Sequence, residues 1–231
     1  MKLAIYGRVY KKEYQKQLQE LFDYLHEKEI TFFVEESFLI QCKQAELRIK
    51  ETNSFDSYES LKQLAADYVI SIGGDGTMLD TLTYVRDLEL PVLGVNSGRL
   101  GFLASVSMDH TAKALDDLQK GHYQLDIRSV LQLESNQELF GGVRYALNDF
   151  VIHKKDSSSM IIIHSYINGE FLNSYWSDGL IIATPTGSTG YSLSCGGPIM
   201  YPSSASFAIT PVAPHNLNVR PIIVSDENET K

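Results

Sequence analysis

Residues 68–77 read YVISIGGDGT, and this stretch decides the fold class of the chain. Its first five residues form a short run rich in apolar and β-branched side chains, which is typical of a buried strand. A turn with three glycines follows, and then a helical pattern with apolar positions at Met78, Leu79, Leu82 and Val85. A strand that leads through a glycine turn into a helix is typical of an α/β fold with a mostly parallel sheet.

The same alternation of strands and helices extends on both sides of this stretch, from residue 1 to about residue 121. We expect further strands over residues 2–6, 31–34 and 91–96. We expect helices over residues 14–25 and 37–47, and a third one that buries Ala112, Leu115 and Leu118 behind a capping Ser107. Residues 1–122 are therefore predicted to form an α/β domain whose mostly parallel sheet is covered on both faces.

Beyond Gly121 the helical period disappears, and β-branched or aromatic runs separated by turns take over. Asn168-Gly169 lies between two such runs and is a strong hairpin signal. Strands are expected over residues 123–133, 143–153, 160–167, 170–175, 180–183, 207–212 and 221–224. Residues 123–231 are predicted to form an all-β, sandwich-like domain.

The composition excludes several classes of protein. The net charge of -9 over 231 residues argues against a nucleic-acid-binding protein, which would carry a basic stripe. The two cysteines, Cys42 and Cys195, are too few for a disulfide framework and favour a reducing compartment. Residues 3–6 are too short for the apolar part of a signal peptide, and no run of about 20 apolar residues predicts a membrane span. We therefore expect a cytoplasmic protein that binds neither nucleic acid nor membrane.

The glycine turn has the composition of a phosphate-binding loop. Gly73, Gly74 and Gly76 let backbone amides approach phosphate oxygens at the start of a helix. The carboxylate of Asp75 would repel phosphate, so its presence indicates a role in the reaction. It either accepts the proton of an attacking hydroxyl or holds the magnesium of a nucleoside triphosphate. We therefore predict an enzyme that transfers a phosphoryl group to a hydroxyl.

A simpler interpretation is a tight turn in which Asp75 caps the helix that begins near Thr77. It is the better interpretation of an isolated Gly-Asp-Gly. The strand before this turn and the helix after it favour the phosphate site instead.

Two further segments are candidate ligand sites. Residues 184–192 read TPTGSTGYS and follow a predicted strand, where hydroxyls and glycine amides offer many hydrogen-bond donors. Asn148-Asp149 interrupts an apolar strand, where the paired side chains could grip ribose hydroxyls. The simpler interpretations are a polar loop that binds nothing and a hydrogen-bonded kink.

Taken in order, these segments resemble the NAD kinase family. The resemblance covers residues from about 68 to 224, in the strings SIGGDGTMLD, NSGRLGFLA, LNDFVIH, SDGLIIATPTGSTGYSLSCGGPIM and VAPHNLNVRPIIV. It implies an enzyme that, with magnesium, transfers the terminal phosphate of ATP to the 2′-hydroxyl of the adenosine ribose of NAD, giving NADP. It also implies a homodimer or a homotetramer.

The resemblance assigns roles to individual residues. Asp75 would be the catalytic base or would orient the 2′-hydroxyl, within an NAD site that also includes Gly74 and Gly76. Arg99 is a phosphate partner by likeness, although a surface ion pair is an equal alternative. The phosphates would be lined by Gly73, Gly74, Gly76 and Thr77.

The rest of the NAD site is implied in the same way. Asn148 and Asp149 would bind the adenine or ribose, Asp178 would lie near the nicotinamide, and Phe102 would pack against an edge of the site. The adenine and ribose would be surrounded by Thr186, Thr189, Gly190 and Tyr191.

The sequence departs from the family in two places. The family usually has glutamate where this chain has Asp149, and its members continue with several strands beyond the one matching residues 221–224. The acidic residues 226–230 therefore predict a truncated sandwich with an unpaired edge. Two other functions remain open: a lipid kinase of the diacylglycerol kinase type, and a nucleotide-binding module without turnover.

Overall fold

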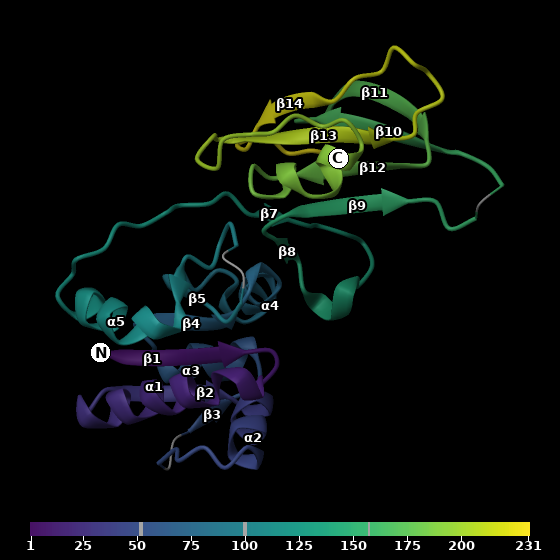
Figure 1. Ribbon diagram of the computed structural model, residues 1–231. Helices are drawn as coiled ribbons and strands as arrows, with labels where there is room; N and C mark the ends of the chain where they lie inside the picture. Colours follow the sequence, from purple (N-terminus) through teal and green to yellow (C-terminus); the bar gives the residue numbers. More distant parts are fainter. Residues whose placement is uncertain (51–52, 99–100, 157) are drawn as a thin grey trace. The chain divides into compact units, whose positions relative to one another are not determined.

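The computed structural model describes residues 1–50, 53–98, 101–156 and 158–231. They form two compact units, Met1–Leu125 and Asp126–Lys231, each with its own sheets (Figure 1). Among the described residues, no helix has the length and apolar character needed to cross a membrane.

The first unit is built on a six-stranded sheet in the order β3-β2-β1-β4-β5-β6. Every pair of neighbouring strands is parallel. Its strands are β1 (Lys2–Gly7), β2 (Thr31–Glu35), β3 (Ser54–Phe55), β4 (Tyr68–Gly73), β5 (Val92–Asn96) and β6 (Val106–Ser107). The predicted parallel sheet is confirmed.

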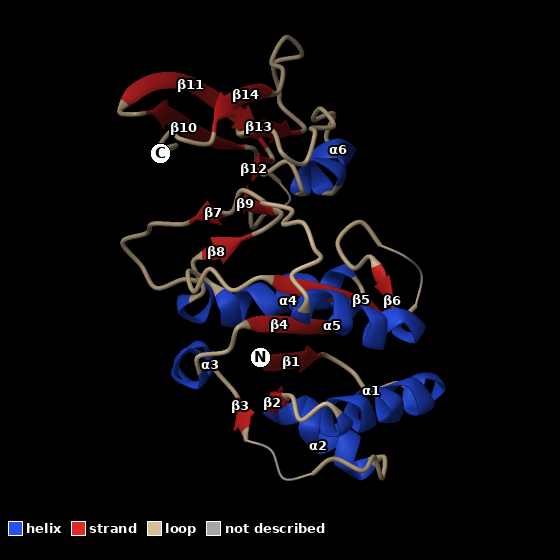
Figure 2. Ribbon diagram, turned by 90° about the vertical axis from the view of Figure 1, so that its left-hand side faces the viewer, coloured by secondary structure: helices blue, strands red, loops and turns tan. Residues whose placement is uncertain are grey.

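Helices cover this sheet on both faces (Figure 2). Leu3 and Ile5 of β1 lie in one apolar core, whereas Ala4 and Tyr6 lie in another, because successive side chains of a strand point to opposite faces. The helices are α1 (Gln15–Glu27), α2 (Glu36–Gln44), α3 (Tyr58–Leu64), α4 (Asp75–Val85) and α5 (Thr111–Gln119), with the 3-10 turns η1 (Lys12–Tyr14) and η2 (Met108–His110).

Details of the first unit differ from the sequence-based predictions. Helix α4 buries Thr77, Thr81 and Val85, so Val85 of the predicted stripe is buried, whereas Met78, Leu79 and Leu82 are half-buried. The hydroxyl of Thr81 donates to the Ser71 hydroxyl on β4 at 2.9 Å, so small polar residues bring helix and strand close together. Ser107 is the N-cap residue of η2, which leads directly into α5, but its hydroxyl bonds to the ring of His110 at 2.8 Å and caps no backbone N–H.

The second unit is all-β apart from short helical turns. A four-stranded antiparallel sheet in the order β14-β13-β12-β9 packs against the hairpin β10–β11 through Tyr175, Leu180 and Ile209, which makes the unit sandwich-like. Its strands are β7 (Leu131–Gln132), β8 (Tyr145–Ala146), β9 (Asp149–His153), β10 (Ile161–Ile167), β11 (Glu170–Ser177), β12 (Gly179–Ala183), β13 (Ser206–Val212) and β14 (Ile222–Ser225). Its helical turns are η3 (Phe140–Gly142), η4 (Gly187–Thr189) and α6 (Tyr191–Ser194).

The turn between β10 and β11 confirms the hairpin predicted from Asn168-Gly169. Both residues have positive φ, 51° and 84°, as a two-residue hairpin turn requires. The strand expected over residues 123–133 is wrong except at β7, because Leu125 and Ile127 are exposed and no neighbouring strand pairs with this stretch among the described residues.

The acidic end of the chain pairs with the hairpin. The backbone N–H of Lys231 donates to the carbonyl of Tyr166 at 2.9 Å, and Thr230 forms a bridge with Ile167. Residues 229–231 therefore extend the β10 edge.

Candidate functional site

The glycine turn joins the carboxyl end of β4 to the first turn of α4. Gly74 is the N-cap residue, and its carbonyl accepts hydrogen bonds from the backbone N–H groups of Thr77 and Met78 at 3.0 and 3.1 Å. A Cβ at Gly73 would lie 2.0 Å from Oγ1 of Thr77, so only glycine fits there. At Gly74, by contrast, no atom of the described residues lies within 4 Å of such a Cβ. The turn is therefore tightly packed at Gly73, whereas Gly74 leaves space beside the first amides of the helix, which attract anions.

The side chain of Asp75 is held by a loop that lies far from it in the sequence. Oδ2 accepts a hydrogen bond from the backbone N–H of Phe102 at 2.8 Å, and Oδ1 accepts from those of Leu103 and Ala104 at 2.9 and 3.2 Å. A Cβ at Gly101 would lie 2.2 Å from Oδ1. The loop can close over the carboxylate only because residue 101 is glycine.

These hydrogen bonds set the charge of Asp75. Burial by itself raises the pKa of this carboxyl, but the N–H groups of Leu103, Phe102 and Ala104 outweigh burial and hold the pKa below its ordinary value. Asp75 is therefore ionised at neutral pH. A carboxylate oxygen can accept two hydrogen bonds, and Oδ2 accepts one from the described residues, so it can accept another from a hydroxyl.

A second group of predicted residues surrounds the segment that follows β12. The backbone N–H of Thr184 donates to the carbonyl of Asn148 at 2.9 Å, and the N–H of Gly187 donates to Oγ1 of Thr184 at 3.1 Å. A Cβ at Gly187 would lie 2.0 Å from the carbonyl oxygen of Asn148. The glycine therefore lets this segment pack directly against the start of β9.

The side chains at this point form a polar surface with one half-buried acid, Asp149. Burial raises the pKa of Asp149, which pairs with Ala183 in the sheet. A Cβ at Gly190 would lie 3.9 Å from Oδ2 of Asp149, and Tyr191 is 41% exposed at the start of α6. The structure thus brings together the predicted residues Asn148, Asp149, Thr186, Thr189, Gly190 and Tyr191.

Arg128 belongs to the same surface and was not predicted from the sequence. Its Nη1 donates to Oγ1 of Thr186 at 3.2 Å, and its Nε donates to Asp126 at 2.9 Å. The side chain is only 18% exposed. A charged residue inside the expected strand 123–133 was the only signal in the sequence that could have identified it.

The remaining predicted site residues are Asp178, Phe102 and Arg99. Asp178 precedes β12, at the opposite end of that strand from Thr184, and forms an ion pair of 2.7 Å with Lys154. The ring of Phe102 is 83% exposed, so its backbone N–H and not its ring touches Asp75. Arg99 lies outside the described residues.

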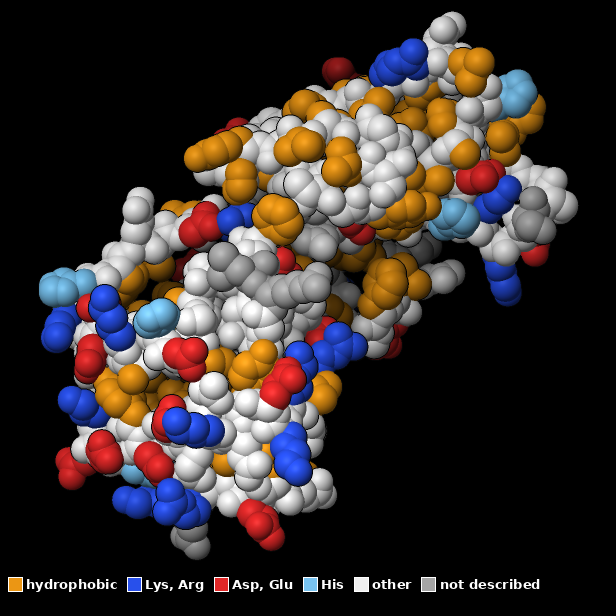
Figure 3. Space-filling model, in the orientation of Figure 1, with side chains coloured by type: hydrophobic (Ala, Val, Ile, Leu, Met, Phe, Trp, Pro, Cys, Tyr) orange, Lys and Arg blue, Asp and Glu red, His pale blue; other side chains and the backbone are white. Residues whose placement is uncertain are grey.

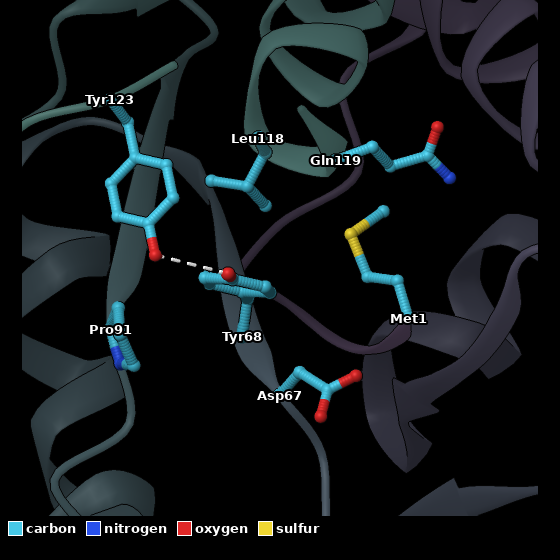
Figure 4. Close-up of a pocket in the computed structure, with 7 residues that line it drawn as sticks. All are labelled: Met1, Asp67, Tyr68, Pro91, Leu118, Gln119 and Tyr123. Carbon is cyan, nitrogen blue, oxygen red and sulfur yellow. Dashed lines mark hydrogen bonds between the residues drawn. The ribbon is translucent and has the colours of Figure 1, made fainter. Parts of the chain in front are cut away.

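A cavity of about 610 Å³ lies at the other edge of the parallel sheet (Figure 4). Asp67, Tyr68 and Pro91 line it at the amino ends of β4 and β5, and the Tyr68 and Tyr123 hydroxyls are 3.1 Å apart. Ligands of open parallel sheets bind at the carboxyl ends of the strands, so this cavity is separate from the glycine turn.

Comparison with known proteins matches each unit to a domain of the ATP-NAD kinases. Residues 3–123 match the family described as the ATP-NAD kinase N-terminal domain, and residues 147–231 match the ATP-NAD kinase C-terminal domain. An NAD kinase of Cytophaga hutchinsonii is 47% identical over 230 residues, which cover 98% of this chain and 77% of that protein. An NAD kinase of Bacteroides fragilis is 46% identical over 230 residues, covering 99% of this chain and 78% of that protein.

Solved structures show the same fold. A crystal structure of yeast NADH kinase complexed with NADH has a TM-score of 0.84 at 26% identity, covering 100% of this chain and 71% of that one. An Archaeoglobus fulgidus NAD kinase in complex with ATP has a TM-score of 0.72 at 24% identity, covering 100% of this chain and 79% of that one, and it supports the fold alone.

Proposed function

The chain belongs to the NAD kinase family, and we propose that it transfers the γ-phosphate of ATP to the 2′-hydroxyl of the adenosine ribose of NAD. The products are NADP and ADP. The observation that carries the proposal is the ionised carboxylate of Asp75, held at the first turn of α4 beside amides suited to phosphate. The diacylglycerol kinase alternative is not favoured, because the relatives of both units are NAD kinases.

In the proposed step the 2′-oxygen attacks the γ-phosphorus. The bond between that phosphorus and the bridging oxygen of ADP breaks, and the hydroxyl proton passes to Oδ2 of Asp75. The low pKa of Asp75 means that the proton moves as the new bond forms and not before it. Phosphoryl transfer depends mainly on positioning and charge stabilisation, so a weak but fixed base is sufficient.

The phosphates of the donor would lie on the glycine turn. Gly74 leaves room beside the first helical amides, and the clash at Gly73 keeps the turn in this conformation. We propose phosphate contacts for Gly73, Gly74, Gly76 and Thr77.

We propose NAD contacts in each unit, taken separately. We propose that Gly74, Asp75 and Gly76 meet the ribose that is phosphorylated, and that Phe102 flanks it. We further propose that Asp178 meets the nicotinamide end, since it lies at the far end of β12 from the polar surface. The adenosine half would be bound by Asn148, Asp149, Thr186, Thr189, Gly190 and Tyr191.

A divalent metal, which we propose to be magnesium, would accompany ATP. The described residues contain no group of three or more His, Cys, Asp or Glu side chains that could hold a metal by themselves. Magnesium in kinases takes much of its coordination from phosphate and water, so the site fits a metal brought by the nucleotide. When bound, it neutralises the charge that develops on the phosphates.

We also propose that the protein forms a homodimer or a homotetramer in the cytoplasm. Hydrophobic side chains gather over the second unit on the face drawn in Figure 3. The large exposed hydrophobic residues of that unit include Ile152, Ile162, Phe171, Trp176 and Ile223. Exposed apolar patches are typical of interaction sites.

Product formation tests the function directly. The protein is incubated with NAD, ATP and magnesium, and NADP is measured with an NADP-specific dehydrogenase. We expect NADP formation that requires all three components. NAD binding without NADP formation would instead favour a module without turnover.

A further inference from the structure

The parallel sheet reverses its strand order between β1 and β4. The chain moves outward from β1 to β2 and β3, and then returns to β4 on the other side of β1. Gly7 pairs with Ile72, so the next residue, Arg8, emerges at the same edge as Gly73. Ligands of open parallel sheets bind in the crevice at such a reversal. Arg8 and the glycine turn therefore lie at the same carboxyl edge of the sheet, beside the reversal of strand order.

The guanidinium of Arg8 lies over the first two turns of α4. Its Nε is 3.4 Å from Oδ2 of Asp80, and its Nη1 lies 3.9 Å from the position that a Cβ would take at Gly76. The Arg8 side chain is 63% exposed. One edge of the guanidinium is thus held by Asp80, and the other faces the glycine turn.

The acidic side chains around the turn require a cation if phosphate is to bind there. Asp75 and Asp80 would both repel a polyphosphate at this place. A guanidinium stays charged at any working pH, and its planar fork fits two phosphate oxygens at once. Since Gly76 has no side chain, phosphate can contact Nη1 and the helix amides together.

We propose that Arg8 binds the phosphates of the donor nucleotide, and that Asp80 is a positioning residue that holds the guanidinium beside Gly76. This inference rests on the proposed kinase function, because it assigns a residue to the donor half of that site. Arg8, which directly follows β1, would supply a cation that binds phosphate, at a position outside the sequence strings that resemble the family.

The competing explanation is an ordinary surface ion pair. Such an exposed pair contributes little to stability and makes no contact with the nucleotide. It therefore predicts small, similar changes in Tm for Arg8→Ala and Asp80→Asn, with unchanged affinity for ATP.

The experiment compares Arg8→Ala, Arg8→Lys and Asp80→Asn with the control Lys12→Ala, which removes an exposed charge from the same segment. KM is measured for ATP and for NAD, and Kd for magnesium-ATP by calorimetry without NAD. We expect Arg8→Ala to raise KM and Kd for ATP about 10-fold or more, as for the loss of a charged hydrogen bond. KM for NAD should stay within about twofold. Arg8→Lys should be intermediate, and Lys12→Ala should match the wild type.

The positioning role is tested by the double variant. Asp80→Asn should raise KM for ATP less than Arg8→Ala does, and should add nothing when Arg8 is already alanine. An unchanged Kd for ATP in Arg8→Ala would overturn the inference while leaving the kinase function intact. A wild-type protein that forms no NADP would overturn the function instead, and the calorimetric comparison would still decide the role of Arg8.

Discussion

The backbone N–H of Leu103 donates a hydrogen bond of 2.9 Å to Oδ1 of Asp75, from a position 28 residues later in the chain. This contact joins the glycine turn to the loop that follows β5. It fixes the rotamer of the carboxylate and favours its ionised form, together with the N–H groups of Phe102 and Ala104. Asp75, which is chemically unusual in a phosphate-binding turn, is thus fixed in place by three backbone N–H groups.

Gly101→Ala tests whether this loop matters for catalysis. The new Cβ would lie 2.2 Å from Oδ1 of Asp75, so the loop must move and its hydrogen bonds to the carboxylate weaken. Each hydrogen bond to a charged acceptor is worth about 1.5–3 kcal/mol, so we expect kcat/KM to fall at least about 10-fold. Steady-state kinetics with NAD and ATP measures this.

Gly98→Ala is the matched control for that variant. A Cβ at Gly98 would meet Oδ1 of Asn96 at 3.8 Å, which is an ordinary contact. Gly98→Ala should therefore keep its activity. Equal losses in the two variants would contradict the specific role of Gly101.

Asp149→Asn should stabilise the free protein at neutral pH while weakening NAD binding. Burial raises the pKa of Asp149 in the folded state, so stability falls as the pH rises from the unfolded-state pKa, and the full cost is present above the folded-state pKa. Below the unfolded pKa the acid is protonated in both states, and the difference from asparagine disappears. Thermal unfolding at pH 7.5 and near pH 4, beside an NAD titration, measures both effects.

Exposed Asp156→Asn serves as the control for charge alone. A Tm at pH 7.5 that is lower for Asp149→Asn than for the wild type would show that burial is not the dominant influence on this carboxyl. Unchanged affinity for NAD would remove Asp149 from the proposed binding surface.

Arg128→Ala should raise KM for NAD roughly 10-fold, because it removes a charged hydrogen bond to Thr186. The change in kcat should be small, since Arg128 acts on the position of a binding residue. Arg128→Lys keeps the charge but loses the planar fork, so it should recover only part of the affinity. The exposed Arg144→Ala should behave like the wild type, and an equal effect there would contradict this assignment.

The parts of the fold with strong local patterns could be predicted from the sequence. The glycine turn between β4 and α4, and the hairpin at Asn168-Gly169, each follow from a local change of period and from glycine. The short elements β3, β6 and α6 were not predicted, because two to four residues are too few to show a strand or helix periodicity. Most of the strand expected over residues 123–133 does not form, because an alternating pattern of apolar and polar residues does not by itself provide a partner strand.

The candidate site could be predicted only in part, for a related reason. Asp75 and residues 184–192 stand out by composition, so their chemistry can be read locally. The contacts that give Asp75 its low pKa come from backbone N–H groups, which have no signature in the sequence. Arg128 and Arg8 are single basic residues outside any motif, and only the folded chain brings them to Thr186 and Gly76.

The most direct test of the account is the turnover of Asp75→Asn. The variant keeps the size of the side chain but removes the charge that accepts the hydroxyl proton, so kcat should fall about 100- to 10,000-fold while Kd for NAD changes little. Asp87→Asn, exposed beyond the other end of α4, should keep the wild-type kcat. Near-normal NADP formation by Asp75→Asn would show that this carboxylate does not receive the proton of the 2′-hydroxyl.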